Sequence, residues 1–319
     1  MTLVCVSRPL PFEFVVPGAE VRFGPEGGFT ERADLLRFYA GASAAVTWFF
    51  ERVDDEFLDA AGPGLKVVSN FAVGYNNIDV RACRARGIVV TNTPDAVTEG
   101  TADMAWALLL GAARRLSAMD RFARSGAWVR RGALGPGDFL GMPLAGRTLL
   151  IVGAGRIGYA TALRSVGWGM RVLYNARRAK PAFEFAPLNG RRVELDEGLR
   201  QADFISVHTP LTEETRHLID ARRLGLCKAT AVLVNTARGP VVDEAALATA
   251  LREGRLFAAG LDVFEREPEV HPELVGLESA VMAPHIGSAT TDSRRRMVEL
   301  CAENVRAVLA GEPAVTPVE

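Results

Sequence analysis

Short apolar runs alternate with amphipathic stretches along the first hundred residues. Five runs predict strands: Leu3–Val6, Val21–Phe23, Ala44–Thr47, Lys66–Ser69 and Ile88–Thr91. Two of the stretches between them predict helices, at Glu31–Tyr39 and Asp54–Ala61. Because strands that alternate with helices need crossover connections, this part of the chain predicts a parallel sheet of the α/β class.

The same alternation returns after an interruption. Residues 97–116 have a long helical pattern with an apolar face, and the Gly- and Trp-rich segment 125–141 is expected to be irregular. A second series of strands is then expected in "TLLIVGAGRIG" (148–158) and at Arg171–Tyr174, Phe204–Val207, Ala231–Asn235, Ala258–Val263 and Val281–Ala283. Many of these runs lack polar residues, as expected for a parallel sheet that is covered on both faces.

Two domains follow from these patterns. A helix expected at about Thr291–Leu309 carries the chain away from the second sheet, so the second domain is inserted into the first. We place the outer domain at residues 1–97 and 288–319 and the inserted domain at residues 98–287, with a cleft between them. A length of 319 residues is also more than one ordinary core holds.

Composition narrows the class of protein. Apolar residues make up 49% of the chain and charged residues 24%, with a net charge of -1, so nothing favours a nucleic-acid partner. No stretch approaches the ~18 apolar residues that span a bilayer, and we expect no membrane partner. The four cysteines are far apart and form no CxxC pair, which predicts no metal site and a reduced, cytoplasmic location.

The segment "LLIVGAGRIG" has the spacing of a dinucleotide-binding loop. Gly153, Gly155 and Gly158 follow a predicted strand and open a helix. The first glycine allows the tight turn, the second lets the backbone approach a pyrophosphate, and the third lets the helix pack on the strand. The phosphates then meet the helix N-terminus. A purely structural glycine turn is the alternative, but the surrounding βα units favour a cofactor.

The end of the next strand selects the cofactor. An NAD site carries an acid there, ~20 residues after the loop, to bind the adenosine ribose. Here "VLYNARRAK" has no acid, and Arg177 and Arg178 follow instead. Two guanidinium groups suit a 2′-phosphate, so we expect NADP(H) to be preferred, with NAD(H) as the alternative. A solvated basic turn would also account for these arginines.

Three candidate catalytic residues follow predicted strands of the second domain. Arg238 follows one strand, Asp262 and then Glu267 end the next, and His285 follows the last. Ligands of open α/β sheets bind at these strand ends. This set suits hydride transfer to a 2-oxo acid: arginine binds the carboxylate and polarises the keto oxygen, histidine protonates that oxygen, and the carboxylate stabilises the charged imidazole. Singly, the residues could be a strand cap, a surface turn and a hydrogen-bonded filler.

Several longer motifs accompany these residues: "NFAVGYNNIDV", "VTNTPDAVTEGTADMAWALLL", "VGAGRIG", "VHTPLTEETRHLI", "VNTARGPVVDEAAL", "AAGLDVFEREP" and "PHIGSAT". By these motifs the chain, from about Val53 to its end, resembles the D-isomer-specific 2-hydroxyacid dehydrogenase family and, within it, the glyoxylate/hydroxypyruvate reductases. The resemblance implies a Rossmann-like cofactor domain inserted into a flavodoxin-like substrate domain. It also implies a homodimer formed through the cofactor domains, with residues 117–143 in the contact.

The resemblance also assigns site residues. It implies that Arg238, Glu267 and His285 are catalytic, and that Val73 and Gly74 bind the substrate carboxylate together with Arg238. Asp262 resembles the residue that holds the nicotinamide amide. The expected cofactor-binding set includes the residues of the glycine loop and the two arginines expected to favour NADP(H). It comprises Thr101, Gly153, Gly155, Arg156, Ile157, Gly158, Asn175, Arg177, Arg178, His208, Thr209, Pro210, Thr215, Thr236, Ala237, Asp262 and Gly287.

Three features depart from the common family pattern. Leu150 replaces a frequent glycine, and we expect an effect on helix packing only. His208 is expected to have a positional role beside the cofactor loop. Trp48 is bulky in a loop expected to face the substrate, so it is included among the substrate-binding residues and leaves the identity of the substrate open.

The leading hypothesis is a reductase that converts glyoxylate or hydroxypyruvate to the D-2-hydroxy acid with NADPH. One alternative keeps the fold and acts on another small 2-oxo or 2-hydroxy acid with NAD. A second alternative is a dinucleotide-sensing binding protein on the same fold, because a fold alone does not establish turnover.

Overall fold

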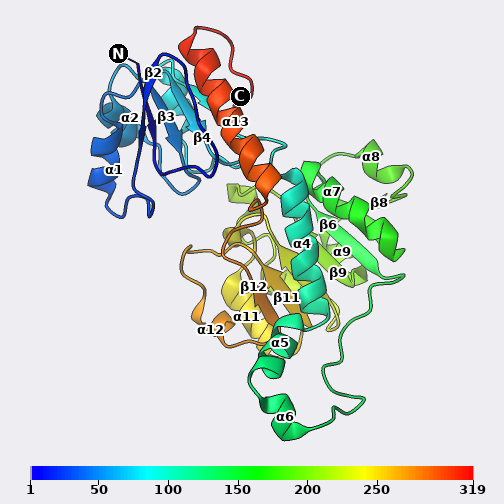
Figure 1. Cartoon of the computed structure of the whole chain (residues 1–319). Helices are drawn as coiled ribbons and strands as arrows, with labels where there is room; N and C mark the ends of the chain where they lie inside the picture. Colours follow the sequence, from blue (N-terminus) through cyan, green and yellow to red (C-terminus); the bar gives the residue numbers. More distant parts are fainter. Residues whose placement is uncertain (1, 319) are drawn as a thin grey trace. The chain divides into compact units, whose positions relative to one another are not determined.

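The computed structural model describes residues 2–318 and divides into two compact units. The terminal unit comprises the residues up to Val97 together with those from Ser288 onward, and the central unit comprises Thr98–Gly287. Each unit is built on a parallel sheet (Figure 1). The α/β class and the doubly wound sheets expected from the sequence are therefore confirmed.

The terminal unit has five parallel strands in the order β2-β1-β3-β4-β5, a flavodoxin-like order. The strands are β1 (Thr2–Val6), β2 (Ala19–Phe23), β3 (Ala44–Thr47), β4 (Val67–Asn70) and β5 (Val89–Thr91). The helices are α1 (Arg32–Tyr39), α2 (Asp55–Ala61), α3 (Val80–Ala85) and α13 (Thr291–Leu309). Alternate strand residues point to opposite faces. Val68 therefore joins the core under α1, α2 and α3, whereas its neighbour Ser69 meets Cys301 of α13.

The central unit has seven parallel strands in the order β12-β11-β10-β9-β6-β7-β8. This is the Rossmann order of two half-sheets, extended by one strand at the β12 edge. The strands are β6 (Thr148–Val152), β7 (Arg171–Asn175), β8 (Arg191–Arg192), β9 (Phe204–Val207), β10 (Val232–Asn235), β11 (Ala258–Leu261) and β12 (Ala280–Met282). The sheet order reverses between β6 and β9, and ligands bind at such a point.

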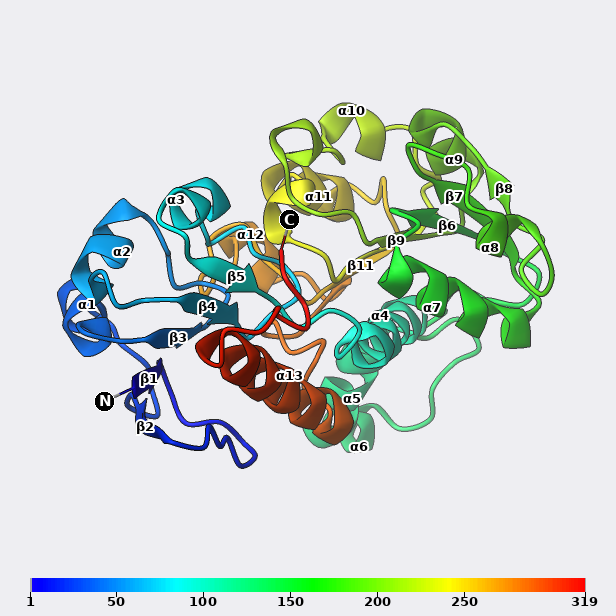
Figure 2. The same ribbon diagram turned by 90° about the horizontal axis from the view of Figure 1, so that it is seen from above.

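Helices cover both faces of the central sheet (Figure 2). They are α4 (Thr98–Ala113), α5 (Leu116–Arg124), α6 (Ala127–Arg131), α7 (Arg156–Arg164), α8 (Pro181–Glu184), α9 (Leu195–Gln201), α10 (Ala221–Leu224), α11 (Glu244–Arg252) and α12 (Pro272–Val275), with 3₁₀ turns η1 (Ser165–Trp168), η2 (Glu213–Thr215) and η3 (Gly239–Val241). Leu149 and Ile151 pack with α4 and α7, while Leu150 and Val152 pack with α9, α10 and α11.

Two expectations about local structure were confirmed only in part. The helix expected at residues 97–116 ends at Ala113, because Arg115 adopts a left-handed backbone (φ 55°) that stops it before α5. The segment 125–141, expected to be irregular, contains the short helix α6. Among residues 2–318, no helix is long and apolar enough to cross a membrane.

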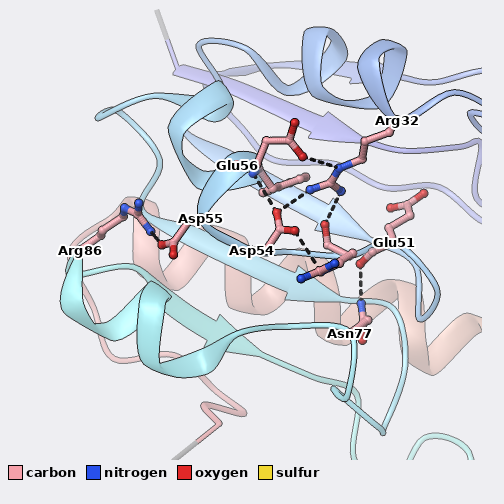
Figure 3. A network of polar contacts seen from close by, with 9 residues as sticks. Arg32, Glu51, Asp54, Asp55, Glu56, Asn77 and Arg86 are labelled. Carbon is pink, nitrogen blue, oxygen red and sulfur yellow. Dashed lines mark hydrogen bonds and ion pairs between the residues drawn. The ribbon is translucent and has the colours of Figure 1, made fainter.

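The loop after β3 is held by side chains of the terminal unit (Figure 3). The carboxylate of Glu51 accepts a hydrogen bond from the Trp48 N–H (2.9 Å). The Asn77 amide donates to the backbone carbonyls of Trp48 (3.1 Å) and Glu51 (2.9 Å). At the end of the loop, Asp54 caps α2 through the Phe57 N–H. Because both ends of the loop are bonded, Trp48 lies on a fixed backbone.

Glu51 is expected to make stability depend on pH. Burial raises the pKa of Glu51 from 4.5 to about 6, against smaller opposing effects of the Trp48 N–H, Ser7 and Arg8. The folded protein therefore binds this proton more tightly than the unfolded chain does, and the resulting stabilisation is lost as the pH rises from about 4.5 through about 6. Glutamine at this position does not titrate, so Glu51→Gln does not lose this stabilisation. As the pH rises through that range, the free energy of unfolding of the variant should increase by about 1–2 kcal/mol relative to that of the unchanged protein. Urea unfolding at pH 4.5 and pH 7.5 measures it, and an equal difference at both pH values would contradict the prediction.

Candidate active site

The glycine loop lies where the central sheet reverses its order. Gly153 follows β6 with a φ of +99°, and a Cβ there would lie 2.7 Å from the backbone of His208 and Thr209, which follow β9. At Gly158 a Cβ would lie 2.3 Å from the Gly153 carbonyl oxygen. The turn and the close packing of α7 on β6 thus both exclude a side chain, for the reasons expected from the sequence.

A pocket of about 830 Å³ opens in front of this loop. Its lining includes nine of the expected cofactor residues: Gly153, Gly155, Asn175, Arg177, Arg178, His208, Thr209, Pro210 and Thr215. At Gly155, the N-cap of α7, a Cβ would meet no atom within 4 Å, so the backbone there faces open space. A helix N-terminus beside a side-chain-free opening fits the pyrophosphate of a dinucleotide.

The rim of this pocket after β7 is strongly basic. Arg177 and Arg178 are exposed, and Lys180 joins them in the lining, a residue that the sequence reasoning missed. Among the lining residues in the described part of the chain, the one acid is Glu214, which comes from η2 and not from the end of β7. The rim therefore presents three cations where an NAD site would place a carboxylate.

Arg192, which the sequence did not predict as a site residue, forms hydrogen bonds to the backbone of this basic rim. Its guanidinium on β8 donates to the carbonyls of Ala176 (2.9 Å) and Arg177 (3.0 Å). The Tyr174 hydroxyl accepts the Lys180 N–H (2.9 Å). These bonds fix the backbone of the rim but leave no periodic signal in the sequence. The short strand β8 that carries Arg192 has only two residues, too few for a pattern to predict.

Glu267 interacts electrostatically with the other two candidate catalytic residues, His285 and Arg238. Its Oε2 lies 2.6 Å from Nδ1 of His285, with the two side chains 27% and 22% exposed. Burial alone would raise the pKa of Glu267, but the bond to His285, the charge of that imidazole, the Phe264 N–H and Arg238 together lower it. Burial lowers the pKa of Arg238, and the nearby charge of Glu267 opposes that shift. The structure thus brings a carboxylate, an imidazole and a guanidinium into one electrostatic group.

Asp262 shapes the turn that carries His285. His285 has a left-handed backbone (φ 55°), which is unfavourable for a residue with a side chain. The buried carboxylate of Asp262 accepts the N–H groups of Ile286 (2.9 Å) and Gly287 (2.7 Å) and so holds the turn. A Cβ at Gly287 would lie 2.8 Å from Asp262 Oδ2. Both oxygens of Asp262 therefore already accept backbone bonds in the role of a turn anchor.

The remaining expected cofactor residues do not line the pocket. These are Thr101, Arg156, Ile157, Gly158, Thr236, Ala237, Asp262 and Gly287. Two of them, Thr101 on α4 and Gly287 after β12, lie beside each other. His208 lines the pocket, but burial lowers its pKa to about 3 and its Nε2 lies 2.8 Å from the Ser206 hydroxyl, which suits a neutral, positional residue.

The expected substrate-binding residues Val73 and Gly74 lie in a loop after β4 of the terminal unit. Asn92 donates to the Val73 carbonyl (2.7 Å) and Asn70 donates to the Gly74 carbonyl (2.8 Å). Within residues 2–318, neither residue's N–H has a hydrogen-bond acceptor. With its carbonyls bonded and its N–H groups available, the loop has the chemistry of an anion-binding turn.

Trp48 follows β3 in the same unit. Its ring stacks on Phe71 with centroids 4.7 Å apart. The guanidinium groups of Arg8 and Arg294 lie 4.9 Å and 5.9 Å from its ring centre. Aromatic stacking and two cation–π contacts hold the indole in one orientation.

Comparison with known proteins adds independent findings. Residues 106–287 match the family model described as D-isomer specific 2-hydroxyacid dehydrogenase, NAD binding domain. The chain is 52% identical over 313 residues to a glyoxylate reductase of Thermococcus onnurineus, covering 97% of this chain and 93% of that protein. A crystal structure of a Thermus thermophilus protein matches with a TM-score of 0.91 and 44% identity over the whole of both chains.

A further solved structure carries ligands. It is an NADPH-dependent glyoxylate/hydroxypyruvate reductase of Sinorhizobium meliloti in complex with NADP and malonate. It matches with a TM-score of 0.82 and 33% identity, covering 99% of this chain and 96% of that one. The agreement extends through both units of the chain.

Proposed function

Because the chain belongs to the D-isomer-specific 2-hydroxyacid dehydrogenase family, a family of nicotinamide-dependent oxidoreductases, we propose that it reduces glyoxylate or hydroxypyruvate to the D-2-hydroxy acid with NADPH. The observation that carries the proposal is the Glu267–His285 pair at 2.6 Å, on the unit that also holds the glycine loop. The glyoxylate reductase relatives support the substrate class.

His285 acts as the general acid in this proposal. When bound, the reduced nicotinamide supplies the hydride for the keto carbon. Protonated His285 gives its Nε2 proton to the keto oxygen, while Nδ1 keeps its bond to Glu267. The negative charge of Glu267 stabilises the imidazolium before transfer and fixes the ring orientation. In this proposal His285 carries the proton that is transferred, and Glu267 orients the imidazole that donates it.

Arg238 and the Val73–Gly74 loop are proposed to bind the substrate. A guanidinium can hold a carboxylate through two parallel hydrogen bonds and at the same time polarise a neighbouring keto oxygen. The N–H groups of Val73 and Gly74 are proposed to donate to the same carboxylate, and Trp48 to limit the size of the substrate side chain. This division leaves His285 as the proton donor.

Seven of the other expected residues are proposed to have one of two roles. Gly153 and Gly155 receive the pyrophosphate at the start of α7, and Thr209 and Pro210 line the pocket beside it. Thr101, Asp262 and Gly287 cluster at the turn that carries His285, and there they are proposed to hold the nicotinamide end.

Nicotinamide absorbance tests the proposal directly. Purified protein would receive NADPH or NADH with hydroxypyruvate, glyoxylate, pyruvate or 2-oxoglutarate. The expected result is fast loss of absorbance with NADPH and either of the first two acids. Turnover with NADH alone would reject the cofactor preference but keep the reaction. Cofactor binding without turnover of any acid would favour the sensing alternative.

The basic rim is expected to set the cofactor preference. Replacing Arg177 and Arg178 with alanine should weaken NADPH binding about 10- to 100-fold and leave NADH binding nearly unchanged, because a charge-assisted hydrogen bond contributes about 1.5–3 kcal/mol and only NADPH carries the 2′-phosphate. Fluorescence titration with both cofactors measures this. Arg191→Ala is the matched control, because Arg191 is an exposed arginine of β8 that does not line the pocket. Equal losses for both cofactors would contradict the selector role.

A homodimer through the central unit is also proposed. Large apolar side chains are exposed in and beside residues 117–143, including Leu116 (59%), Trp128 (52%), Val129 (89%) and Leu140 (65%). Such a concentration of exposed apolar groups is typical of an interface, and a second copy of this chain is the proposed occupant. Light scattering should give twice the chain mass for the unchanged protein and a lower mass for Trp128→Asp combined with Val129→Asp. A monomer at micromolar concentration would reject the dimer.

A further inference from the structure

Two glutamates outside the proposed catalytic set link the segment that follows Arg238 to the segment that precedes Glu267. The Glu244 N–H donates to Oε1 of Glu265 (3.0 Å), and the Glu265 N–H donates to Oε1 of Glu244 (2.6 Å). Glu244 is the first residue of α11, which follows Arg238 through the turn η3. Glu265 lies two residues before Glu267. The reciprocal bonds therefore cross-link the two loops.

The cross-link is largely shielded from water. Glu244 is 5% exposed and the Glu265 side chain is 20% exposed. Beneath it the two backbones touch, because a Cβ on Gly239 would lie only 1.9 Å from the Phe264 carbonyl carbon. A hydrogen bond is stronger where water competes less, so this contact resists separation of the loops.

The two glutamates differ in their electrostatic surroundings. Burial and the nearby Glu265 raise the pKa of Glu244. For Glu265 the raising effect of burial is outweighed by the Glu244 N–H and His217, and its pKa is lowered. The ionised form is thus more favoured at Glu265 than at Glu244, and Glu265 lies at the N-terminus of α11, where the helix dipole stabilises negative charge. His217 adds a third link. Its Nε2 lies 3.1 Å from Oε2 of Glu265, and its backbone N–H donates to the Pro240 carbonyl (2.7 Å).

The cross-linked segment sets the position of Glu267. The Phe264 N–H, adjacent to Glu265, donates to Oε1 of Glu267 (2.9 Å), which leaves Oε2 for His285 (2.6 Å). A shift of the backbone at Phe264 and Glu265 would therefore move the carboxylate that orients the imidazole. Misplacement of a catalytic group by about 1 Å can cost about 10²-fold in rate.

We propose that Glu265, with Glu244 as its partner, is a positioning residue of the reduction step: it holds the Glu267 carboxylate in register with His285 and with the loop of Arg238. Glu265 acts through Glu267, and binding of substrate and cofactor does not need it. The inference rests on the proposed function, because it assigns Glu265 an effect on the turnover proposed for this site.

Glu265→Ala tests the inference in the full-length protein. We expect kcat with NADPH and the best 2-oxo acid to fall about 10- to 100-fold, while KM for the acid and the dissociation constant of NADPH change less than about threefold. Glu265→Gln keeps an oxygen for the Glu244 N–H and should restore kcat to within about fivefold of the unchanged protein. If Glu265→Gln did not restore kcat, the negative charge and not the hydrogen bond would be what the site needs, and the inference would be overturned.

Asp243→Ala is the matched control. Asp243 caps the same helix by accepting the Ala246 N–H (2.9 Å) but makes no side-chain bond to residues 264–267. Its loss should lower the thermal midpoint and leave kcat within about twofold. A fall in kcat as large as that of Glu265→Ala would mean that any damage to α11 suffices, and would overturn the inference.

A double-mutant cycle provides a second test. Glu244→Ala should lower kcat about as much as Glu265→Ala does, and the double variant should lose little more than either one. Glu244→Ala with the same kcat criterion replaces Glu265→Ala if that variant does not fold. Normal kcat in these variants, or additive losses, would overturn the inference. No turnover by the unchanged protein would instead reject the proposed function.

Discussion

Replacing His285 with alanine is expected to lower kcat about 10²–10⁴-fold while NADPH binds with nearly unchanged affinity. A positioned general acid contributes rate enhancement of this size, and the variant leaves the glycine loop and the basic rim untouched. Without the imidazole, Glu267 keeps its hydrogen bond from the Phe264 N–H, but the imidazole that it orients as proton donor is gone. Single-turnover reduction of hydroxypyruvate and NADPH titration separate the two effects.

His271 provides the control for this prediction. It is a partly exposed histidine that caps α12 by accepting the Glu273 N–H, and within residues 2–318 it forms no hydrogen bond with Glu267. His271→Ala should keep normal turnover. If His285→Ala also turned over normally, the proton would have to come from another group or from water, and the general-acid assignment would fail.

The pairing of Glu267 with His285 illustrates what a sequence can predict about a site. Both residues follow neighbouring parallel strands, β11 and β12, and such strands end at the same edge of a sheet. Apolar runs and βα alternation locate those ends to within one or two residues, so the neighbourhood of the two side chains follows from the pattern. Gly153 and Gly158 were predictable for a related reason, since the turn and the close packing allow no side chain.

Other features have no periodic signal. The left-handed backbone of His285 depends on Asp262, which lies far back along the chain, accepting the N–H groups that follow His285. Arg192 reaches back to carbonyls of the basic rim, and Glu244 and Glu265 exchange bonds across two loops. Side-chain bonds to backbone groups depend on where loops pass each other in space. Neither hydropathy nor spacing encodes that, so these contacts emerged only from the structure.

The positions found only from the structure share one property. Arg192 and the Glu244–Glu265 pair fix the backbone from which Arg177, Arg178 and Glu267 project. The sequence identifies side chains whose chemistry suits the reaction, because that chemistry is a property of residue type. It identifies poorly the residues that position them, because many residue types can donate to a carbonyl. Preorganisation of the site is therefore the part that needs three-dimensional information.

Arg238→Lys is expected to lower kcat/KM for the 2-oxo acid about 10²–10³-fold, a loss of about 3–4 kcal/mol in transition-state stabilisation. Lysine keeps the charge but not the planar fork that can hold a carboxylate and polarise the adjacent keto oxygen together. The effect should appear in both kcat and KM, because binding and polarisation use the same group. Steady-state kinetics at saturating NADPH measure both parameters.

Chemical rescue separates geometry from folding in this prediction. Arg238→Ala should regain part of its kcat/KM when free guanidinium is added, because the half-buried site of Arg238 leaves room for the missing group. Methylammonium, which matches a lysine head group, should rescue less. Arg222→Lys is the control, since Arg222 pairs with Asp196 on the surface and should not affect turnover. Equal rescue by the two cations, or full activity of Arg238→Lys, would show that a point charge suffices and would remove the bidentate role from Arg238.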